Sequence, residues 1–333
     1  MGGGSLWSCY DNIINTINFE KIISIENLLL AWKEFIIGKK SRKDVQEFQL
    51  HLMDNILFLH QDLKNKVYIH GKYYAFNISD PKPRNIHKAT ALDRLLHHAI
   101  YRILYPYFDK KFIHDSYSCR FEKGTHKGMN RFRGYFSKVS KNNTKTCHIL
   151  KCDIKKFFAN IDHDVLKKIL SRFNLDSGTL WLLGQVIDSF HQGLPLGNLT
   201  SQLLVNVYMN EFDQYMKREL KVKYYIRYAD DFVILYENKE FLENLLPKIN
   251  TYLNTYLNIY LHPDKVFIKT LASGVDFLGW VHFPKHRVLR TSTKRRMFKQ
   301  LKENPREESL QSYLGMLSHG NAHKLAREIK GLK

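Results

Sequence analysis

The chain has 333 residues, 44% hydrophobic and 13% aromatic, which excludes a disordered chain and is enough for two or three subdomains. Its 52 Lys and Arg against 32 Asp and Glu give a net charge of +20, which favours a polyanionic partner such as nucleic acid. A basic protein whose lysines are merely solvated is the alternative on charge alone.

Cysteine content and hydropathy exclude two further classes. The four cysteines form no CxxC pair, and no cysteine pair lies near a matched histidine pair, so we expect neither a disulfide framework nor a zinc site. The sequence has no run of about 18 apolar residues and no signal-peptide pattern. We therefore expect a soluble cytoplasmic protein with no membrane partner.

The first half of the chain is predicted to be mainly helical. Apolar residues at three-to-four spacing predict helix over 20–62 and an amphipathic helix over 91–108. Between them, 66–83 has the pattern of a β-hairpin that runs into a proline-containing loop. The polar, basic stretches 123–132 and 138–146 are predicted as loops, although the first could open a helix.

From residue 148 onward, strands and helices alternate. We expect a strand at 148–154, a hairpin at 224–236 and two short strands with the sequences KVFIK and VDFLGWVHF. The expected helices are 163–173, 179–191, 201–220, 240–257 and the basic segment from 287 to the end. A mixed α+β protein with packed subdomains fits this pattern best.

The hairpin YYIRYADDFVILY, residues 224–236, places Asp230 and Asp231 side by side between two apolar strands. Two carboxylates at such a turn repel each other and lose hydration unless a cation neutralises them. The alternative is a solvated turn in which Asp only supplies turn geometry. Hard oxygen ligands without Cys or His favour Mg²⁺.

A third carboxylate is expected from Asp153, which closes the predicted strand 148–154. Three acids on neighbouring strand ends would hold two Mg²⁺ about 4 Å apart, which activate an attacking hydroxyl and stabilise a pyrophosphate leaving group. Taken alone, Asp153 is more simply a strand-end cap. Its pairing with the two acids of the hairpin supports the ligand role.

The YADD motif, preceded by the DxxxFF of DIKKFF, resembles the palm of reverse transcriptases. The resemblance continues in order through seven blocks: RNIHKATALDRLLHHAI, SYSCRFEKGTHKG, KCDIKKFFANIDH, GLPLGNLTSQLLVNVYMNEFD, YIRYADD, LNIYLHPDKVFI and FLGW. It implies a right-hand polymerase fold with an antiparallel palm sheet backed by helices. The implied parts are a helical extension 1–65, fingers 66–147, a palm 148–286 with a finger insertion around 165–200, and a helical thumb 287–333.

The resemblance also implies catalytic roles at matching positions. Asp153, Asp230 and Asp231 match the metal-binding triad, with the carbonyl of Ile154 as an extra ligand and with Mn²⁺ as a substitute for Mg²⁺. Lys265 matches a lysine that protonates the leaving pyrophosphate. Its alternative is a solvated lysine at the edge of a strand.

A second set of positions matches the site for the deoxynucleotide. Phe158 matches the aromatic steric gate that excludes a 2′-hydroxyl, whereas Phe157 is expected in the core. Lys82 and Arg84 resemble residues that clamp the triphosphate, for which a point charge and a bidentate guanidinium are suited. Arg120 is a weaker candidate, equally suited to the template backbone.

The fourth block departs from most relatives, which have PQG followed by SP. Here Leu196 stands in place of the Gln before Gly197, and Ser201 and Gln202 follow. The LGxxxSQ pattern resembles the reverse transcriptases of diversity-generating retroelements, which implies low fidelity at template adenines. It also implies a structured template RNA, an RNA–DNA hybrid, and a small basic accessory protein that can be oligomeric. The alternative is that Leu196 only packs.

Other interpretations stay open at this point. A bacterial defence or group II intron-like reverse transcriptase shares the polymerase blocks. A catalytically inactive nucleic-acid-binding scaffold belongs to a different class, and an RNA-dependent RNA polymerase would have Gly before the paired acids. The segment 309–325 resembles a thumb that follows an A-form hybrid, and residues 1–65 are expected to grip template RNA.

Overall fold

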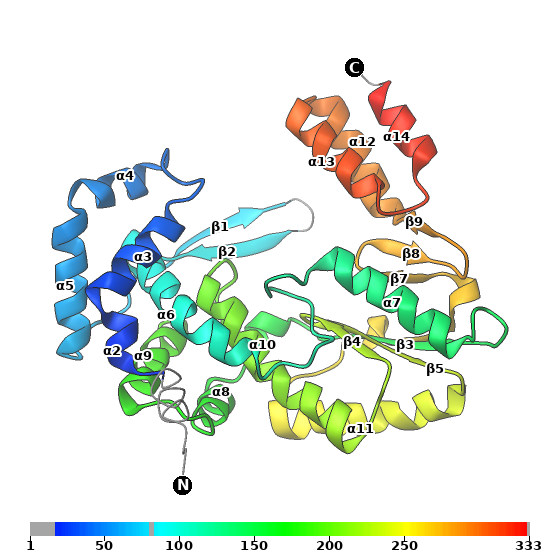
Figure 1. Ribbon diagram of the computed structural model, residues 1–333, viewed down its shortest axis with the longest axis horizontal. Helices are drawn as coiled ribbons and strands as arrows, with labels where there is room; N and C mark the ends of the chain where they lie inside the picture. Colours follow the sequence, from blue (N-terminus) through cyan, green and yellow to red (C-terminus); the bar gives the residue numbers. More distant parts are fainter. Residues whose placement is uncertain (1–16, 80–82, 332–333) are drawn as a thin grey trace, which may run out of the picture. The chain divides into compact units, whose positions relative to one another are not determined.

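The computed structural model describes residues 17–79 and 83–331. Lys82, a predicted triphosphate contact, lies outside these residues. The chain divides into two compact units: unit 1 holds 1–112, 156–213 and 256–259, and unit 2 holds 113–155, 214–255 and 260–333. Figure 1 shows the elements of each unit in sequence colours.

Unit 1 is built mainly from helices. They are α2 (Phe19–Ile23), α3 (Ile25–Phe35), α4 (Lys43–Leu50), α5 (Leu52–Lys64), α6 (Ala91–Asp109), α8 (His163–Leu170), α9 (Ser177–Asp188) and α10 (Leu199–Gln214). The helix predicted over 20–62 is thus four helices. It divides at Ser24, whose side chain accepts a hydrogen bond from the backbone of Asn27 and caps α3. It divides again at the turn around Gly38, whose φ is 68°, and at His51, between α4 and α5.

The hairpin predicted within 66–83 is wrong in its strands. Strand β1 (Tyr74–Ile78) pairs instead with β2 (Arg84–Lys88). The residues before β1 have other partners: the Tyr68 hydroxyl donates to Asp93 Oδ1 at 2.7 Å, and the Gly71 amide donates to the same carboxylate. Because buried Asp93 satisfies these donors, they need no strand partner.

Unit 2 contains two antiparallel sheets and the remaining helices. The first sheet has the order β4-β5-β3-β6 and the second β7-β8-β9. The strands are β3 (His148–Asp153), β4 (Tyr225–Tyr228), β5 (Asp231–Tyr236), β6 (Phe267–Thr270), β7 (Val275–Phe277), β8 (Trp280–His282) and β9 (Arg287–Leu289). The helices are α7 (Thr125–Val139), α11 (Lys239–Leu257, whose last two residues fall in unit 1), α12 (Thr291–Glu303), α13 (Glu307–Leu317) and α14 (His323–Lys330).

Three predicted elements of unit 2 need correction. The segment VDFLGWVHF is a hairpin rather than one strand, because Leu278 and Gly279 turn the chain with φ values of 53° and 85°. The segment from residue 287 opens as strand β9, and its helix begins only at Thr291. The stretch 123–132, mostly expected as loop, lies largely in α7.

Two hydrophobic clusters hold unit 2 together. In the first, α7 packs Phe132 and Phe136 against the sheet strands through Ile149 and Val233. In the second, α12, α13 and α14 bury apolar side chains against Trp280 and against Met129 of α7, as a small helical bundle in orange and red (Figure 1). Helix α7 therefore belongs to both cores and fixes the carboxylate-bearing strands to the C-terminal helices.

Candidate active site

Strand pairing in unit 2 brings two of the predicted metal ligands face to face. Strands β3 and β5 are antiparallel, and their register places Asp153 directly opposite Asp231. Side chains at paired positions lie on the same face of a sheet, with Cβ atoms about 5 Å apart. The Ile154 amide donates to the Asp230 carbonyl at 3.1 Å. The structure thus brings together the three acids that the sequence places 77 residues apart.

The turn that carries Asp230 has an unusual backbone. Tyr228 pairs with Asp231, so Ala229 and Asp230 alone connect the two strands. Ala229 has a φ of 54°, which L-residues other than glycine rarely adopt and which costs on the order of 1 to 3 kcal/mol. The fold tolerates this conformation at the point where the two acids are presented.

Arg227, which is fully buried, supports this turn. One guanidinium nitrogen donates to the Ala229 carbonyl and another to the hydroxyl of Ser116, both at 3.1 Å. The neighbouring loop is fixed by buried Asp115, which accepts from Arg131 and Tyr135. Sequence reasoning missed Arg227, although an arginine inside an otherwise apolar strand signals a specific buried partner.

We expect Ala229→Val to destabilise the protein by about 1 to 3 kcal/mol more than Ala229→Gly, because a β-branched residue tolerates a positive φ least and glycine most. Urea unfolding of the two variants measures the difference. Equal stabilities would mean that the turn relaxes to a negative φ without cost.

Two lysines lie against the carboxylates. Lys151 Nζ is 3.2 Å from Asp231 Oδ2, with both side chains mostly buried. Lys265 Nζ is 2.9 Å from Asp153 Oδ1, so the predicted catalytic lysine does lie beside the triad. Lys151 was not predicted. Its position two residues before Asp153 on the same strand, and therefore on the same face, was the available signal.

Asp231 has an environment suited to a cation. Its Oδ1 is buried and has no hydrogen-bond partner among the described residues. Burial, with a smaller contribution from Asp153 and Asp230, raises the pKa of Asp231 to about 7 despite the opposing charge of Lys151. An orphaned buried oxygen next to two further carboxylates is the donor chemistry that a hard divalent cation requires.

The donor atoms therefore suit a metal ion, but the side chains do not form a complete metal site. In residues 17–79 and 83–331, no group of three or more His, Cys, Asp or Glu side chains is arranged to hold a metal ion. Asp153 and Asp231 are instead neutralised by the two lysines. Asp153, Asp230 and Asp231 would hold such an ion only once the carboxylates turn from these lysines.

The side chain of Arg120, also in unit 2, forms hydrogen bonds within its own loop. Its guanidinium donates to the carbonyls of Ile113 and Ser116 at 2.7 and 3.0 Å. These bonds hold the segment that pairs with Arg227, because Ser116 forms an isolated bridge with that residue. A contact of Arg120 with nucleotide or template stays a prediction.

In unit 1 the predicted nucleotide contacts include residues of strand β2, of the segment before α10 and of the first turn of α10. The His87 amide of β2 donates to the Leu196 carbonyl at 3.0 Å, and Asn198 Nδ2 donates to the His87 carbonyl at 3.3 Å. Gly197 has a φ of 108°, and a Cβ there would lie 2.8 Å from Ile86. A glycine is required at this position by both backbone and space. Arg84 begins the same strand.

The segment that contains Phe158 contacts the chain just before Leu196. The Leu194 amide donates to the Phe158 carbonyl at 2.8 Å, and Gly193 approaches the same carbonyl too closely for a side chain. Phe158 is half-buried, whereas Phe157 is buried as expected for a core residue. Ser201 is buried in the first turn of α10, and Gln202 is half-buried beside it. Their contact with a nucleotide stays a prediction.

A comparison with protein families decides the assignment. Residues 78–282, more than half of the chain, match the model described as "Reverse transcriptase (RNA-dependent DNA polymerase)". The chain belongs to the reverse transcriptase family. The match spans the strands that carry the three acids and the loop that carries Leu196, so this reverse transcriptase retains the regions on which its family is defined.

Curated relatives agree at low identity. Protein YkfC of Escherichia coli is 24% identical over 273 residues, which cover 69% of this chain and 70% of that protein. A putative COX1/OXI3 intron 2 protein of Saccharomyces cerevisiae is 22% identical over 207 residues, 42% of this chain but only 24% of that protein. The reverse transcriptase thus spans most of the first relative and a small part of the second.

Solved structures show the fold. Apo telomerase from Candida tropicalis superposes with a TM-score of 0.53 at 14% identity, covering 74% of this chain and 52% of that one. Telomerase from Candida albicans gives 0.51 at 12% identity over 76% and 52%. The reverse transcriptase spans about half of each telomerase chain and has their right-hand polymerase fold. Its division into fingers, palm and thumb at the predicted residues stays a prediction.

The helices carry no membrane signal. Among the described residues, none is both long and apolar enough to cross a bilayer.

Proposed function

We propose that the chain copies RNA into DNA by two-metal nucleotidyl transfer at Asp153, Asp230 and Asp231. The observation that carries this proposal is the opposition of Asp153 and Asp231 across β3 and β5, together with the buried Oδ1 of Asp231, which has no hydrogen-bond partner among the described residues. Two Mg²⁺, or Mn²⁺ in their place, would supply activation of the primer 3′-hydroxyl and neutralisation of the leaving pyrophosphate.

The chain's own residues have separate tasks in this proposal. Arg227 and the strained Ala229 hold the acids in place, and the Ile154 carbonyl is an additional ligand. Lys265, 2.9 Å from Asp153, would give a proton to the pyrophosphate, and Lys151 is the ion-pair partner of Asp231 in the metal-free protein. Phe158, placed by its carbonyl bond to Leu194, rejects ribonucleotides through collision with a 2′-hydroxyl.

Nucleotide selection is assigned to the loops of unit 1. Arg84, together with Lys82, binds the triphosphate, and the segment from Leu196 to Gln202 lies against the nascent base pair. An aliphatic side chain at 196 offers no hydrogen bond where most relatives carry an amide. The polymerase then distinguishes a correct base pair from a mispair by shape alone, which lowers its discrimination between the two.

We therefore place the enzyme in a diversity-generating retroelement, where a cDNA with errors at template adenines is the product. Its partners in this proposal are a structured template RNA and a small basic accessory protein, in the cytoplasm. The intron-encoded relatives support a second candidate, a group II intron-like enzyme of ordinary fidelity.

The error spectrum distinguishes these candidates. On a template containing all four bases, we expect misincorporation to concentrate at adenines and to fall by about tenfold in Leu196→Gln, since one hydrogen bond is worth about 1 kcal/mol or more in a buried site. Sequencing of the cDNA measures both. Errors spread evenly over the four bases, or unchanged in the variant, would contradict the retroelement role.

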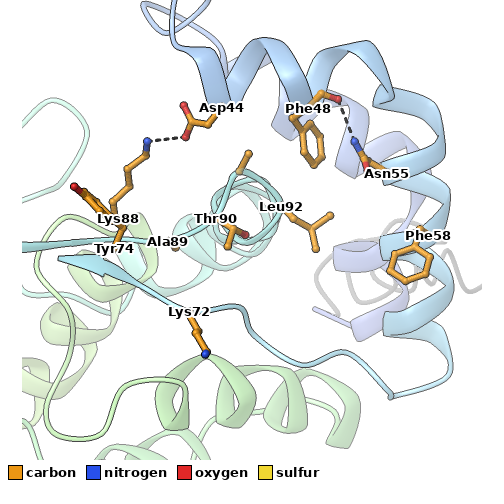
Figure 2. Close-up of a pocket in the computed structure, with 11 residues that line it drawn as sticks. Asp44, Phe48, Asn55, Phe58, Lys72, Tyr74, Lys88, Ala89, Thr90 and Leu92 are labelled. Carbon is orange, nitrogen blue, oxygen red and sulfur yellow. Dashed lines mark hydrogen bonds and ion pairs between the residues drawn. The ribbon is translucent and has the colours of Figure 1, made fainter.

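A hollow in unit 1 supports a contact with template RNA. It has a volume of about 550 Å³ and lies between α4, α5, the first strands and the start of α6 (Figure 2). Phe58 and Tyr74, 64% and 71% exposed, offer faces on which unpaired bases can stack. Lys72 lines the same hollow and supplies positive charge, whereas Lys88, also in the lining, is paired with Asp44 at 2.6 Å. The N-terminal helices are therefore proposed to grip the single-stranded template.

A further inference from the structure

Unit 2 contains a second hollow, apart from the carboxylates, whose lining carries positive charge and no acid. It has a volume of about 440 Å³ and lies among α7, the β8–β9 connection and the α13–α14 connection. Arg133, Lys285, His286 and Arg287 line it, together with His319. Four of these side chains come from two segments, 133 and 285–287, that are far apart in sequence.

The arginines of this hollow are held by neutral groups only. Arg287 donates to the carbonyl of His319 and to Asn130 Oδ1, the latter at 3.3 and 3.4 Å. Arg133 donates to the Phe283 carbonyl. Within the part of the chain that the structure describes, neither arginine nor Lys285 forms an ion pair with a carboxylate. Their side chains are thus oriented while their charge stays unbalanced.

The electrostatics of the cluster agree with its geometry. Burial lowers the pKa of Arg133, and burial together with the charge of Arg133 lowers the pKa of Arg287. Burial also lowers the pKa of His126, with smaller contributions in the same direction from His319 and Arg287. The rings of His126 and His319 are stacked, with their centroids 3.5 Å apart. The side chains that act on these residues, Arg133, Arg287 and His319, are all basic. An anion in the hollow would relieve this repulsion.

The shape of the donors indicates which anion. Guanidinium forks match the paired oxygens of a phosphate, and a lysine adds a point charge. The lining is almost entirely polar and contains no Phe, Tyr or Trp side chain on which a base could stack. A phosphodiester group, whose bases and sugars lie outside the hollow, fits better than a whole nucleotide.

We propose that Arg133, Lys285 and Arg287 form a binding site for phosphodiester groups of the nucleic-acid backbone. The proposal rests on the proposed function for the presence of a nucleic-acid substrate. It adds a contact that the polymerase motifs do not include, at the base of the C-terminal helices. Because such contacts are independent of sequence, they hold the duplex in register without affecting base selection.

The test is the salt dependence of binding to an RNA–DNA hybrid of fixed length by the full chain. Arg133→Gln/Lys285→Gln is expected to weaken binding by about fivefold to tenfold at moderate salt, and to reduce the slope of log K against log salt by about one to two. The control, Lys138→Gln/Lys145→Gln, removes the same charge from exposed positions outside the hollow. Lys285→Gln alone, at an exposed turn position, tests the site without risk to folding.

Each outcome has a clear meaning. Slopes that are equal in the pocket variant and the control would overturn the site. Loss of inorganic pyrophosphate binding in the variant, with an unchanged hybrid slope, would assign the hollow to free phosphates and overturn the backbone proposal. Since binding is measured without catalysis, a chain that passes this test but fails to polymerise would contradict only the proposed function.

Discussion

Asp230→Asn is expected to reduce deoxynucleotide incorporation on a primed RNA template by about a thousandfold or more. The substitution keeps the shape of the side chain but removes a charge from the triad, and with it several kcal/mol of transition-state stabilisation. Asp230 lies in a two-residue turn whose backbone is fixed by Arg227 and by the Ile154 amide, so the fold should not change. Primer extension measures the loss.

The matched control is Asp264→Asn, the same substitution at a carboxylate whose side chain is 87% exposed. It lies next to Lys265 yet has no role in the proposed chemistry, so incorporation should stay within about twofold of wild type. Hybrid binding should be retained in both variants. An Asp230→Asn enzyme with wild-type incorporation would contradict the assignment of the triad.

A second large effect is expected in the stability of the metal-free protein. The pKa of Asp231 is raised to about 7 in the folded state, above its value near 3.8 in an unfolded chain. A raised carboxyl pKa stabilises the fold at low pH, and that contribution is lost as the pH rises through 7. Relative to Asp231→Asn, wild type should lose about 3 kcal/mol of unfolding free energy between pH 5 and pH 8.

Chemical denaturation in the presence of EDTA, at several pH values, measures this difference. The comparison with Asp231→Asn cancels the titration of groups that are common to both proteins. Addition of Mg²⁺ at pH 8 should restore wild type and leave the variant unchanged. Parallel pH curves for the two proteins would show that Asp231 is ionised in the metal-free fold and needs no cation.

The fold could be predicted where the spacing of hydrophobic residues and the turn-forming residues indicate the same element. The apolar runs around Asp153 and around Asp230 and Asp231 form strands β3, β4 and β5 close to their expected limits. Helix α7 was underestimated because its first turn is polar and glycine-rich. Its buried Met129, Phe132 and Phe136 nonetheless follow helical spacing, so periodicity was the better guide than composition.

The first hairpin could not be placed from local pattern. Residues 66–73 have strand-like composition, but Tyr68 and Gly71 bond to Asp93, which lies more than 20 residues later. A long-range buried carboxylate of this kind overrides strand propensity and leaves no local trace in the sequence.

The candidate site was predictable in its acids and not in their support. The YADD and DxxxFF motifs predicted Asp153, Asp230 and Asp231, and strand pairing places Asp153 opposite Asp231. Their metal-binding role stays a prediction. Lys151 and Arg227 were missed because their roles depend on register and burial. Both occupy strands next to the acids, where a charged residue in an apolar run was the only visible sign.

The most direct measurement of the central claim is primer extension by the wild-type chain on an RNA template, with deoxynucleotides or ribonucleotides and with Mg²⁺ or EDTA. The account predicts extension with deoxynucleotides and Mg²⁺, little extension with ribonucleotides, and none with EDTA. Extension that persists in EDTA, or that prefers ribonucleotides, would contradict it, as would a chain that binds the hybrid with its triad intact but adds no nucleotide.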